Sequence, residues 1–330
     1  MKASLLFVFL ALSTSTLLSQ SIPVFNTFLF DKYSLNPSYV ADNGFSQVNL
    51  IHKRLWAGID DSPVISGLNI QYPYSDKIGF AISFLNDRRI LLSNNTAFST
   101  LSYRLCISKY HQIQFGISGG VRFRQFESDD IEDVIDPALN NLATNSTSFQ
   151  SQFGISYSYR SFGIGFALPQ LIKERNIHDN KAIFQVFDRF SGNIYYNYEA
   201  TLNLDIETYA LFVRDANLSD FVEIGVLGKV SNSFAIGTFY REARGLGLIV
   251  KSSFKKLDFA YAYEDGSAQN LSFTGSTHEL QVKFNLDERV KRTNQSISKY
   301  KHNSSYRKRK KRITKKRRSK SLRKVRKPRY

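Results

Sequence analysis

The sequence predicts an all-β fold: a closed antiparallel barrel of 14 strands, of the outer-membrane type, followed by a disordered basic tail. Three observations predict it. Apolar and polar residues alternate with a period of two along most of the chain, the connections alternate between short and long, and the N-terminus is typical of an exported protein. Beyond the N-terminus no uninterrupted apolar run reaches 18 residues, so helical membrane spans are not expected.

The N-terminus has the layout of a secretory signal peptide over residues 1–19. Lys2 supplies the positive charge and residues 5–12 (LLFVFLAL) supply the apolar core. Cleavage is expected before Gln20. No cysteine directly follows the apolar core, so a lipid anchor is not expected.

The rest of the chain divides into three expected parts. Residues 20–44 form an N-terminal periplasmic segment, residues 45–286 the outer-membrane barrel, and residues 287–330 a disordered basic tail in the periplasm. The chain holds a single cysteine, Cys106, so no disulfide framework stabilises this exported protein. A large core or a bilayer must do so instead.

Alternation identifies the strands in chain order. Eight stretches alternate clearly: residues 78–84, 101–107, 113–124, 149–160, 162–168, 245–251, 257–264 and 279–286. Six alternate more weakly: residues 45–56, 64–72, 190–199, 202–212, 221–227 and 234–241. An even count of 14 suits a closed exported barrel with both termini on the periplasmic side.

The two faces of these strands differ in chemistry. One is rich in Phe and Tyr, as a lipid-facing surface with aromatic girdles requires, and the other mixes Gly, Ser, Gln and Arg, as a polar lumen does. The residues expected to form a lumen charge network are Arg104, Arg122, Arg160, Asp205 and Glu207. A soluble β-sandwich also needs one apolar face per strand and is the alternative.

The lengths of the connections favour the barrel over the sandwich. Short connections are expected at residues 73–76, 108–110, 160–161, 200–201 and 253–256. The other set includes long ones, at residues 57–63, 86–94, 125–148, 169–188 and 265–277. Short periplasmic turns that alternate with longer outside loops are typical of outer-membrane barrels. The loops at 125–148 and 169–188 are candidates to plug the lumen.

Catalytic and metal-binding motifs are weak. Residues 116–120 (GISGG) match G-x-S-x-G, but Ser118 falls in mid-strand on the lumen face, not on the strand-to-helix turn that a nucleophile needs. The five histidines show no metal spacing, and the acidic loop at residues 129–136 lacks the pattern of a calcium loop. The protein is therefore expected to have no enzymatic activity, cofactor or metal.

The basic charge is confined to the tail. Residues 289–330 hold 21 Lys and Arg and no acid, which leaves 24 basic and 28 acidic residues, a net charge of −4, in the rest of the chain. The densest runs are Arg307, Lys308, Arg309, Lys310, Lys311, Arg312, Lys315, Lys316, Arg317 and Arg318. Such runs often bind nucleic acid, but an exported chain is expected to meet an anionic periplasmic surface instead, or to act as a tether only.

Four segments resemble a known family in the same order along the chain. They are residues 28–39 (FLFDKYSLNPSY), 55–63 (LWAGIDDSP), 86–87 (ND) and 277–280 (THEL), and they resemble motifs of the PorP/SprF family of type IX secretion system membrane proteins. The positions that match are Asn36, Pro37, Tyr39, Trp56, Gly58, Pro63, Asn86, Asp87, His278 and Glu279. The basic tail is not part of the family pattern. Asn-Pro and Gly also simply make turns, and Trp56 suits a membrane interface.

The resemblance implies a non-enzymatic outer-membrane barrel of the type IX secretion and gliding machinery. Such a protein supports the secretion or surface attachment of a large cargo protein, for example an adhesin. The implied partners are that cargo, other type IX secretion components and outer-membrane lipid, with no nucleic acid. The alternative is an outer-membrane transport pore.

Overall fold

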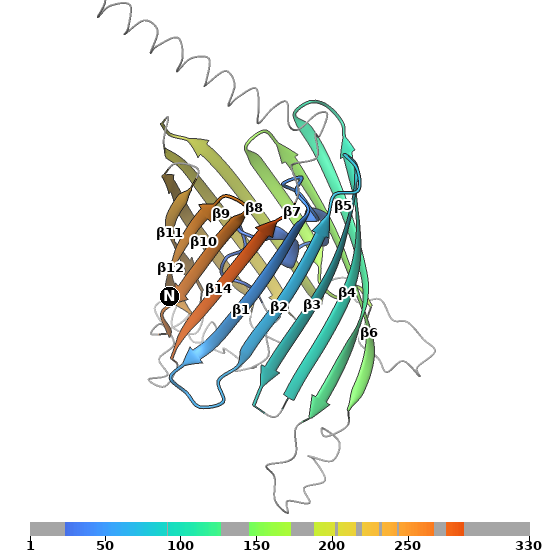
Figure 1. The fold of residues 1–330 in the computed structure, drawn as a ribbon, viewed down its shortest axis with the longest axis vertical. Coiled ribbons are helices and arrows are strands. Elements are labelled where there is room, and N and C mark those ends of the chain that lie inside the picture. Colours follow the sequence, from blue (N-terminus) through green and yellow to red (C-terminus); the bar gives the residue numbers. More distant parts are fainter. Residues whose placement is uncertain are drawn as a thin grey trace, which may run out of the picture.

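The computed structural model describes residues 24–286 except 91, 127–144, 173–187, 202–203, 216–219, 231–232, 243 and 267–274. Fourteen antiparallel strands form one closed barrel, as predicted (Figure 1). They are β1 Gln47–Ala57, β2 Val64–Tyr72, β3 Ile78–Arg89, β4 Leu92–Cys106, β5 His111–Phe126, β6 Ser146–Tyr159, β7 Phe162–Leu168, β8 Arg189–Glu199, β9 Leu204–Asp215, β10 Phe221–Val230, β11 Phe234–Arg241, β12 Gly245–Phe254, β13 Leu257–Glu264 and β14 Ser276–Asn285.

Each strand pairs with its neighbours in sequence, and β14 pairs with β1 to close the barrel. The closing register runs from Gln47 opposite Asn285 to Arg54 opposite His278, with a register shift between Arg54 and Ala57. The start of β1 and the end of β14 therefore lie at the same end of the barrel as the short turns. We call this the turn end, at the top of Figure 1, and the opposite one the loop end.

One predicted connection is wrong. Residues 86–94 were expected to form a long loop, but β3 continues to Arg89 and β4 begins at Leu92. Asn86 pairs with Asn95 across the two strands, and the Asn86 Nδ2 donates to Asn95 Oδ1 at 2.8 Å. Beyond the apolar band, strands no longer need apolar residues on their outer face, so the alternation ends before the strand does. The expected loops at 125–148 and 169–188 lie largely outside the described residues.

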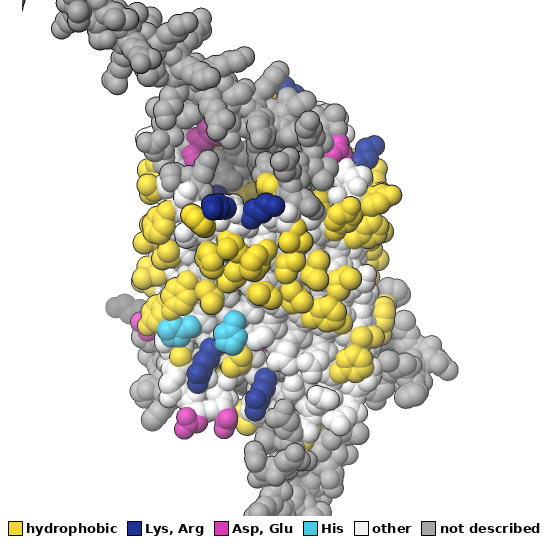
Figure 2. All heavy atoms as spheres, viewed as in Figure 1, with side chains coloured by type: hydrophobic (Ala, Val, Ile, Leu, Met, Phe, Trp, Pro, Cys, Tyr) yellow, Lys and Arg dark blue, Asp and Glu magenta, His cyan; other side chains and the backbone are white. Residues whose placement is uncertain are grey.

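The outer face of the barrel carries a continuous apolar band, which is visible around the middle of the molecule in Figure 2. Its exposed residues include Phe80, Ile82, Leu101, Ile117, Ile164, Ile224, Leu248, Tyr261 and Leu280. Inward residues on the same strands, such as Gln114 and Ser118, are buried. The predicted division into lipid and lumen faces is confirmed. No helix in the described part of the chain is long and apolar enough to cross a membrane.

The position of the N-terminal segment differs from the prediction. Residues 20–44 were expected to form an N-terminal periplasmic segment, whereas the described part, from residue 24, lies inside the barrel. It includes two 3-10 turns, η1 Lys32–Ser34 and η2 Pro37–Tyr39, which Figure 1 shows within the ring of strands. The segment shows no alternation of apolar and polar residues because its polar side chains bond to groups on the inner wall of the barrel. We call residues 24–45 the plug.

Candidate functional site: the plugged lumen

The lumen has two walls of different chemistry. Strands β2–β8 form the polar wall, whose buried inward side chains are mainly amides and hydroxyls: Asn69, Gln71, Thr100, Ser102, Gln112, Gln114, Ser118, Gln150, Ser156 and Asn193. Strands β9–β14 and β1 form the charged wall, where ionic residues surround an apolar patch. Its ionic members are Lys53, Glu207, Glu223, Arg241, Glu264 and Glu279, and its apolar members are Leu211, Leu227, Phe239, Ile249 and Ala262. The plug contacts both walls.

The η2 turn is bound to the polar wall by Asn36. Its side-chain oxygen accepts from Ser38 N at 2.9 Å, which caps the turn, and the following proline fixes the backbone. The Asn36 Nδ2 donates to the carbonyl oxygens of Ile155 at 3.3 Å and Phe166 at 3.2 Å, on β6 and β7. One side chain therefore both shapes the turn and attaches it to the barrel.

Three inward glycines make room for this turn. A Cβ at Gly116 would lie 2.2 Å from the Pro37 carbonyl carbon, and one at Gly154 would lie 2.0 Å from Asn36 Oδ1. A Cβ at Gly165 would lie 2.6 Å from the Tyr39 hydroxyl oxygen. Any other residue at these positions would clash with the turn. We call Gly116, Gly154 and Gly165 the glycine notch.

The G-x-S-x-G match at residues 116–120 belongs to this polar wall. Ser118 lies in mid-strand, and its hydroxyl is 2.8 Å from Thr100 Oγ1, which is 2.8 Å from the Tyr33 hydroxyl of the plug. As predicted, Ser118 is on the lumen face and not on a strand-to-helix turn.

A buried carboxylate joins the plug to β1 and β2. Asp31 Oδ2 accepts from Asn49 Nδ2 at 2.8 Å and from Asn69 Nδ2 at 2.9 Å. Asp31 Oδ1 accepts from Gln71 Nε2 at 3.0 Å. Three amide donors from two strands thus fix one plug side chain, and charge-assisted bonds of this kind are stronger than neutral ones.

The first residues of the plug bind Glu279 on the charged wall. Glu279 accepts from the backbone N–H of Asn26 at 2.6 Å and of Thr27 at 3.0 Å, and also from the Thr27 hydroxyl. Lys53 Nζ donates to Val24 O at 2.8 Å and lies 3.4 Å from Glu279. Lys53 and Glu279 are fully buried, so the plug completes the coordination of a buried ion pair.

Polar contacts continue along the wall through residues of β13, β11, β10 and β9. Asn26 Nδ2 donates to Glu264 at 3.0 Å, and Glu264 lies 3.7 Å from Arg241. Arg241 Nε donates to Glu223 at 2.7 Å, and Glu223 accepts from the Tyr209 hydroxyl at 2.7 Å. Phe28 of the plug packs into the apolar patch beside these ions, with its ring 5.9 Å from that of Tyr209.

Lys32 and Asp42 join the η1 turn to the residues that follow η2, near the turn end of the barrel. Their charged groups are 2.9 Å apart, and Lys32 also lies over the rings of Tyr39, at 4.9 Å, and Tyr195, at 4.2 Å. Burial alone would lower the pKa of Lys32, but Asp42 and the two tyrosines raise it well above its ordinary value. Lys32 therefore remains a cation inside the lumen.

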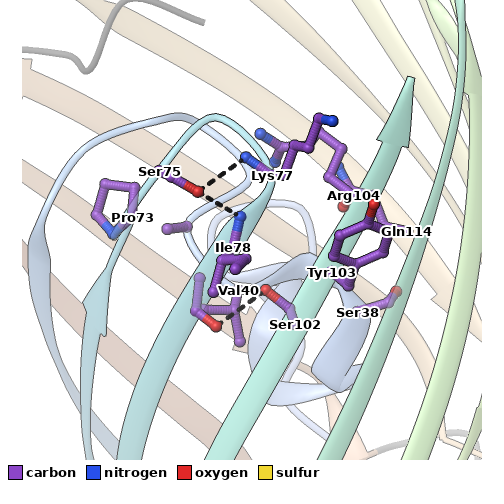
Figure 3. A pocket seen from close by; sticks show the side chains of 12 residues that line it. Ser38, Val40, Pro73, Ser75, Lys77, Ile78, Ser102, Tyr103, Arg104 and Gln114 are labelled. Carbon is purple, nitrogen blue, oxygen red and sulfur yellow. Dashed lines mark hydrogen bonds between the residues drawn. The ribbon is translucent and has the colours of Figure 1, made fainter.

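A small pocket remains between the plug and the turn end of the polar wall (Figure 3). It lies beside Ser38 and Val40 of the plug and is closed by Lys77, Arg104 and Gln114 of the barrel. Its volume of about 10 Å³ accommodates about one water molecule. The pocket is too small for an organic ligand, so the candidate functional site is the plug together with the walls that bind it.

The structure places the motif positions in three areas. Asn36, Pro37 and Tyr39 form the turn in the glycine notch, and Glu279 binds the start of the plug. The remaining positions lie near the loop end: Trp56, Gly58, Pro63, Asn86, Asp87 and His278. There a Cβ at Gly275 would lie 2.2 Å from Ala57 O, so the segments around Trp56 and His278 are neighbours.

The expected charge network is only partly correct. Glu207 lies 2.7 Å from Lys229, and Arg104 lies 3.8 Å from Asp42 of the plug. Arg160 is not in the lumen: it occupies the β6–β7 turn with a φ of 53° and lies 4.7 Å from the Tyr110 ring. The residues that sequence reasoning missed are Asn26, Asp31, Lys53, Glu223, Arg241 and Glu264. The one feature of the sequence that could have identified these residues is a charged or amide side chain at an inward strand position or in the segment before β1.

Comparison with known proteins adds the family. The sequence matches the family described as type IX secretion system membrane protein PorP/SprF over residues 17–284. No curated protein sequence matches the chain.

Solved structures share the barrel form at low similarity. The toluene transporter TbuX of Ralstonia pickettii is 8% identical with a TM-score of 0.47, and the match covers 80% of this chain and 94% of TbuX. The monoaromatic hydrocarbon channel CymD is 8% identical with a TM-score of 0.46, over 82% of this chain and 95% of CymD. Scores this low support no conclusion about function. The family match spans most of the chain, so the protein belongs to the PorP/SprF family of type IX secretion system membrane proteins and is an outer-membrane β-barrel.

Proposed function

We propose that this barrel is a non-enzymatic component of the type IX secretion and gliding machinery that supports the secretion or surface attachment of a large cargo protein such as an adhesin. The observation that carries the proposal is the plug. It crosses the lumen from Glu279 on the charged wall to the glycine notch on the polar wall, and its polar groups are paired with both. A lumen filled in this way suits a protein that holds a partner rather than one that passes solutes.

Single-channel conductance tests this proposal against the transport pore. The full-length protein in a planar bilayer should show no stable ion conductance. A variant that lacks residues 24–45 should conduct, because 14 strands without a plug leave a polar lumen. Stable conductance by the full-length protein would favour the pore and contradict the proposal.

A secretion assay tests the cellular role. Cells without this protein should fail to display the cargo on their surface, and the full-length gene should restore display. Restoration by the variant without residues 24–45 would show that the plug is dispensable for the cargo. Normal display without the protein would refute the role.

The orientation follows the usual rule for such barrels: the turn end faces the periplasm and the loop end faces outside. Residues 287–330 would then lie in the periplasm, as the sequence predicts, and bind an anionic surface by charge. Deletion of residues 289–330 should leave barrel insertion intact and weaken retention by peptidoglycan fractions. In the full-length protein that retention should fall with added salt, because charge attraction is screened over about 8 Å at physiological ionic strength. Salt-independent retention would contradict the electrostatic account.

A further inference from the structure

A polar cluster interrupts the lipid-facing surface where β14 meets β1. His52 and Arg54 alternate on the outer face of β1, and His278 lies opposite Arg54 on β14. His52 and Arg54 are exposed, and His278 is half-buried. We call these three residues the seam cluster. Figure 2 shows His and basic side chains just below the apolar band on the face that carries β14 and β1.

Hydroxyl groups hold the seam cluster in place. Arg54 Nε donates to Ser62 Oγ at 2.9 Å, and His52 Nδ1 is 3.1 Å from Ser66 Oγ. The two ring nitrogens of His278 are 2.7 Å from the Tyr261 hydroxyl and 3.0 Å from Ser276 Oγ. Each member of the cluster therefore has a hydroxyl partner in the protein.

Arg54 differs from the basic residues of the lumen. Lys53, which precedes Arg54 in the chain and faces the lumen, lies 3.4 Å from Glu279, and Arg241 lies 2.5 Å from Glu223. Arg54 has no acidic partner in the part of the chain that the structure describes. An arginine near the hydrocarbon edge without a protein anion is well placed to bind an anion from the surroundings.

The level of the cluster indicates where that anion is. Leu50 and Leu280, the next outward residues toward the turn end on β1 and β14, are both 46% exposed, as lipid-facing residues are. The cluster therefore begins where the apolar band ends, at the depth of the lipid headgroups. At this depth the strongest anions are lipid phosphates, which the planar guanidinium of arginine binds through two parallel hydrogen bonds.

We propose that Arg54 and His52 form a binding site for a phosphate group of an outer-leaflet glycolipid, beside His278, whose two ring nitrogens are already bonded to Tyr261 and Ser276.

The chain contains its own reporter for this site. Trp56 is the only tryptophan, is 36% exposed and lies two residues from Arg54. The full-length protein in neutral detergent micelles is titrated with bisphosphorylated lipid A, and the Trp56 emission is recorded. The emission should change saturably. Dephosphorylated lipid A should bind at least about tenfold more weakly, because it lacks the phosphates that accept the charge-assisted bonds. Phosphatidylglycerol keeps one singly charged phosphate diester and should bind more weakly than lipid A, whose phosphate monoesters carry more charge.

Variants distinguish the site from general charge attraction. Arg54→Gln and His52→Gln should each weaken lipid A binding, by about tenfold for Arg54→Gln. Arg214→Gln is the matched control, because Arg214 is also an exposed outward arginine but lies opposite Phe190 on β8, far from the seam. It should bind as the unchanged protein does. Heat-modified gel migration checks that each variant is folded, and His52→Gln provides the test if Arg54→Gln does not fold.

Five results would overturn the proposal. They are equal binding of phosphorylated and dephosphorylated lipid A, undiminished binding by both seam variants, an equal loss in Arg214→Gln, preferential binding of phosphatidylglycerol, and the same emission change with inorganic phosphate at the same concentration. The last would show a site for free phosphate and not for a lipid. Preferential binding of phosphatidylglycerol would show a phospholipid site and would refute the glycolipid ligand.

Discussion

The two walls of the lumen hold the same plug by different physics. On the polar wall, recognition is by shape: three glycines leave a notch, and Asn36 binds two backbone carbonyl oxygens in it. On the charged wall, recognition is by charge: Glu279 binds two backbone N–H groups of the plug beside the buried Lys53. A substitution that adds atoms at the notch makes them clash with the plug. A substitution that removes one member of the ion pair leaves the other charged group buried without its partner. The two walls should therefore be weakened by different kinds of substitution.

The largest effect is expected on the charged wall. Glu279→Ala leaves Lys53 buried without its carboxylate, which typically costs about 3–5 kcal/mol of the free energy of unfolding. Urea unfolding in micelles, followed by far-UV circular dichroism, measures the loss. The charge itself is tested with Glu279→Ala/Lys53→Met, which removes both charges and should recover part of the loss. If the double variant is no more stable than Glu279→Ala, the buried charge of Lys53 is not the cause.

A smaller effect is expected from the glycine notch. Gly116→Val places atoms where Pro37 lies, and overpacking of this kind typically costs about 1–3 kcal/mol. The plug is not one of the paired strands, so it can move out of its position more easily than a strand can. The substitution should therefore also displace the η2 turn. A water-soluble maleimide should then label Ser38→Cys, made in a Cys106→Ala background, faster than it does without the valine.

Gly119→Val is the matched control for the notch. Gly119 lies on the same strand but faces outward, and a Cβ there meets nothing closer than 3.9 Å. It should change neither stability nor labelling of residue 38. Equal labelling in the Gly116→Val and Gly119→Val proteins would mean that the notch does not hold the turn.

The barrel was predictable from the sequence because each strand carries its own signal. Alternation identified all 14 strands, and it also identified the two faces of the eight that alternate clearly. It failed at residues 86–94, where β3 and β4 extend beyond the apolar band and lose the apolar pattern while keeping their backbone pairing. Strand ends outside the hydrocarbon region are set by such pairing and not by hydropathy.

The plug was not predictable in the same way. Its contacts join single residues that are far apart in sequence, such as Asn26 with Glu264 and Asp31 with Asn69. No local period marks such pairs. The Asn36-Pro37 motif indicated a turn, but only the inward glycines of three other strands show where that turn binds. The family resemblance identified Asn36 and Glu279 as positions of interest without relating them.

The smallest effect is expected from Asn36 itself, and it separates the two tasks of that side chain. Asn36→Ala loses the cap of η2 and two donated bonds, and loss of a cap typically costs about 0.5–2 kcal/mol. Asn36→Asp keeps an oxygen that can cap Ser38 N, but it brings a carboxylate against the carbonyl oxygens of Ile155 and Phe166. If attachment to the polar wall matters more than the cap, Asn36→Asp should be at least as unstable as Asn36→Ala and should label more readily at residue 38. If Asn36→Asp behaves like the unchanged protein, the side chain only shapes the turn, and the glycine notch alone holds the plug on this wall.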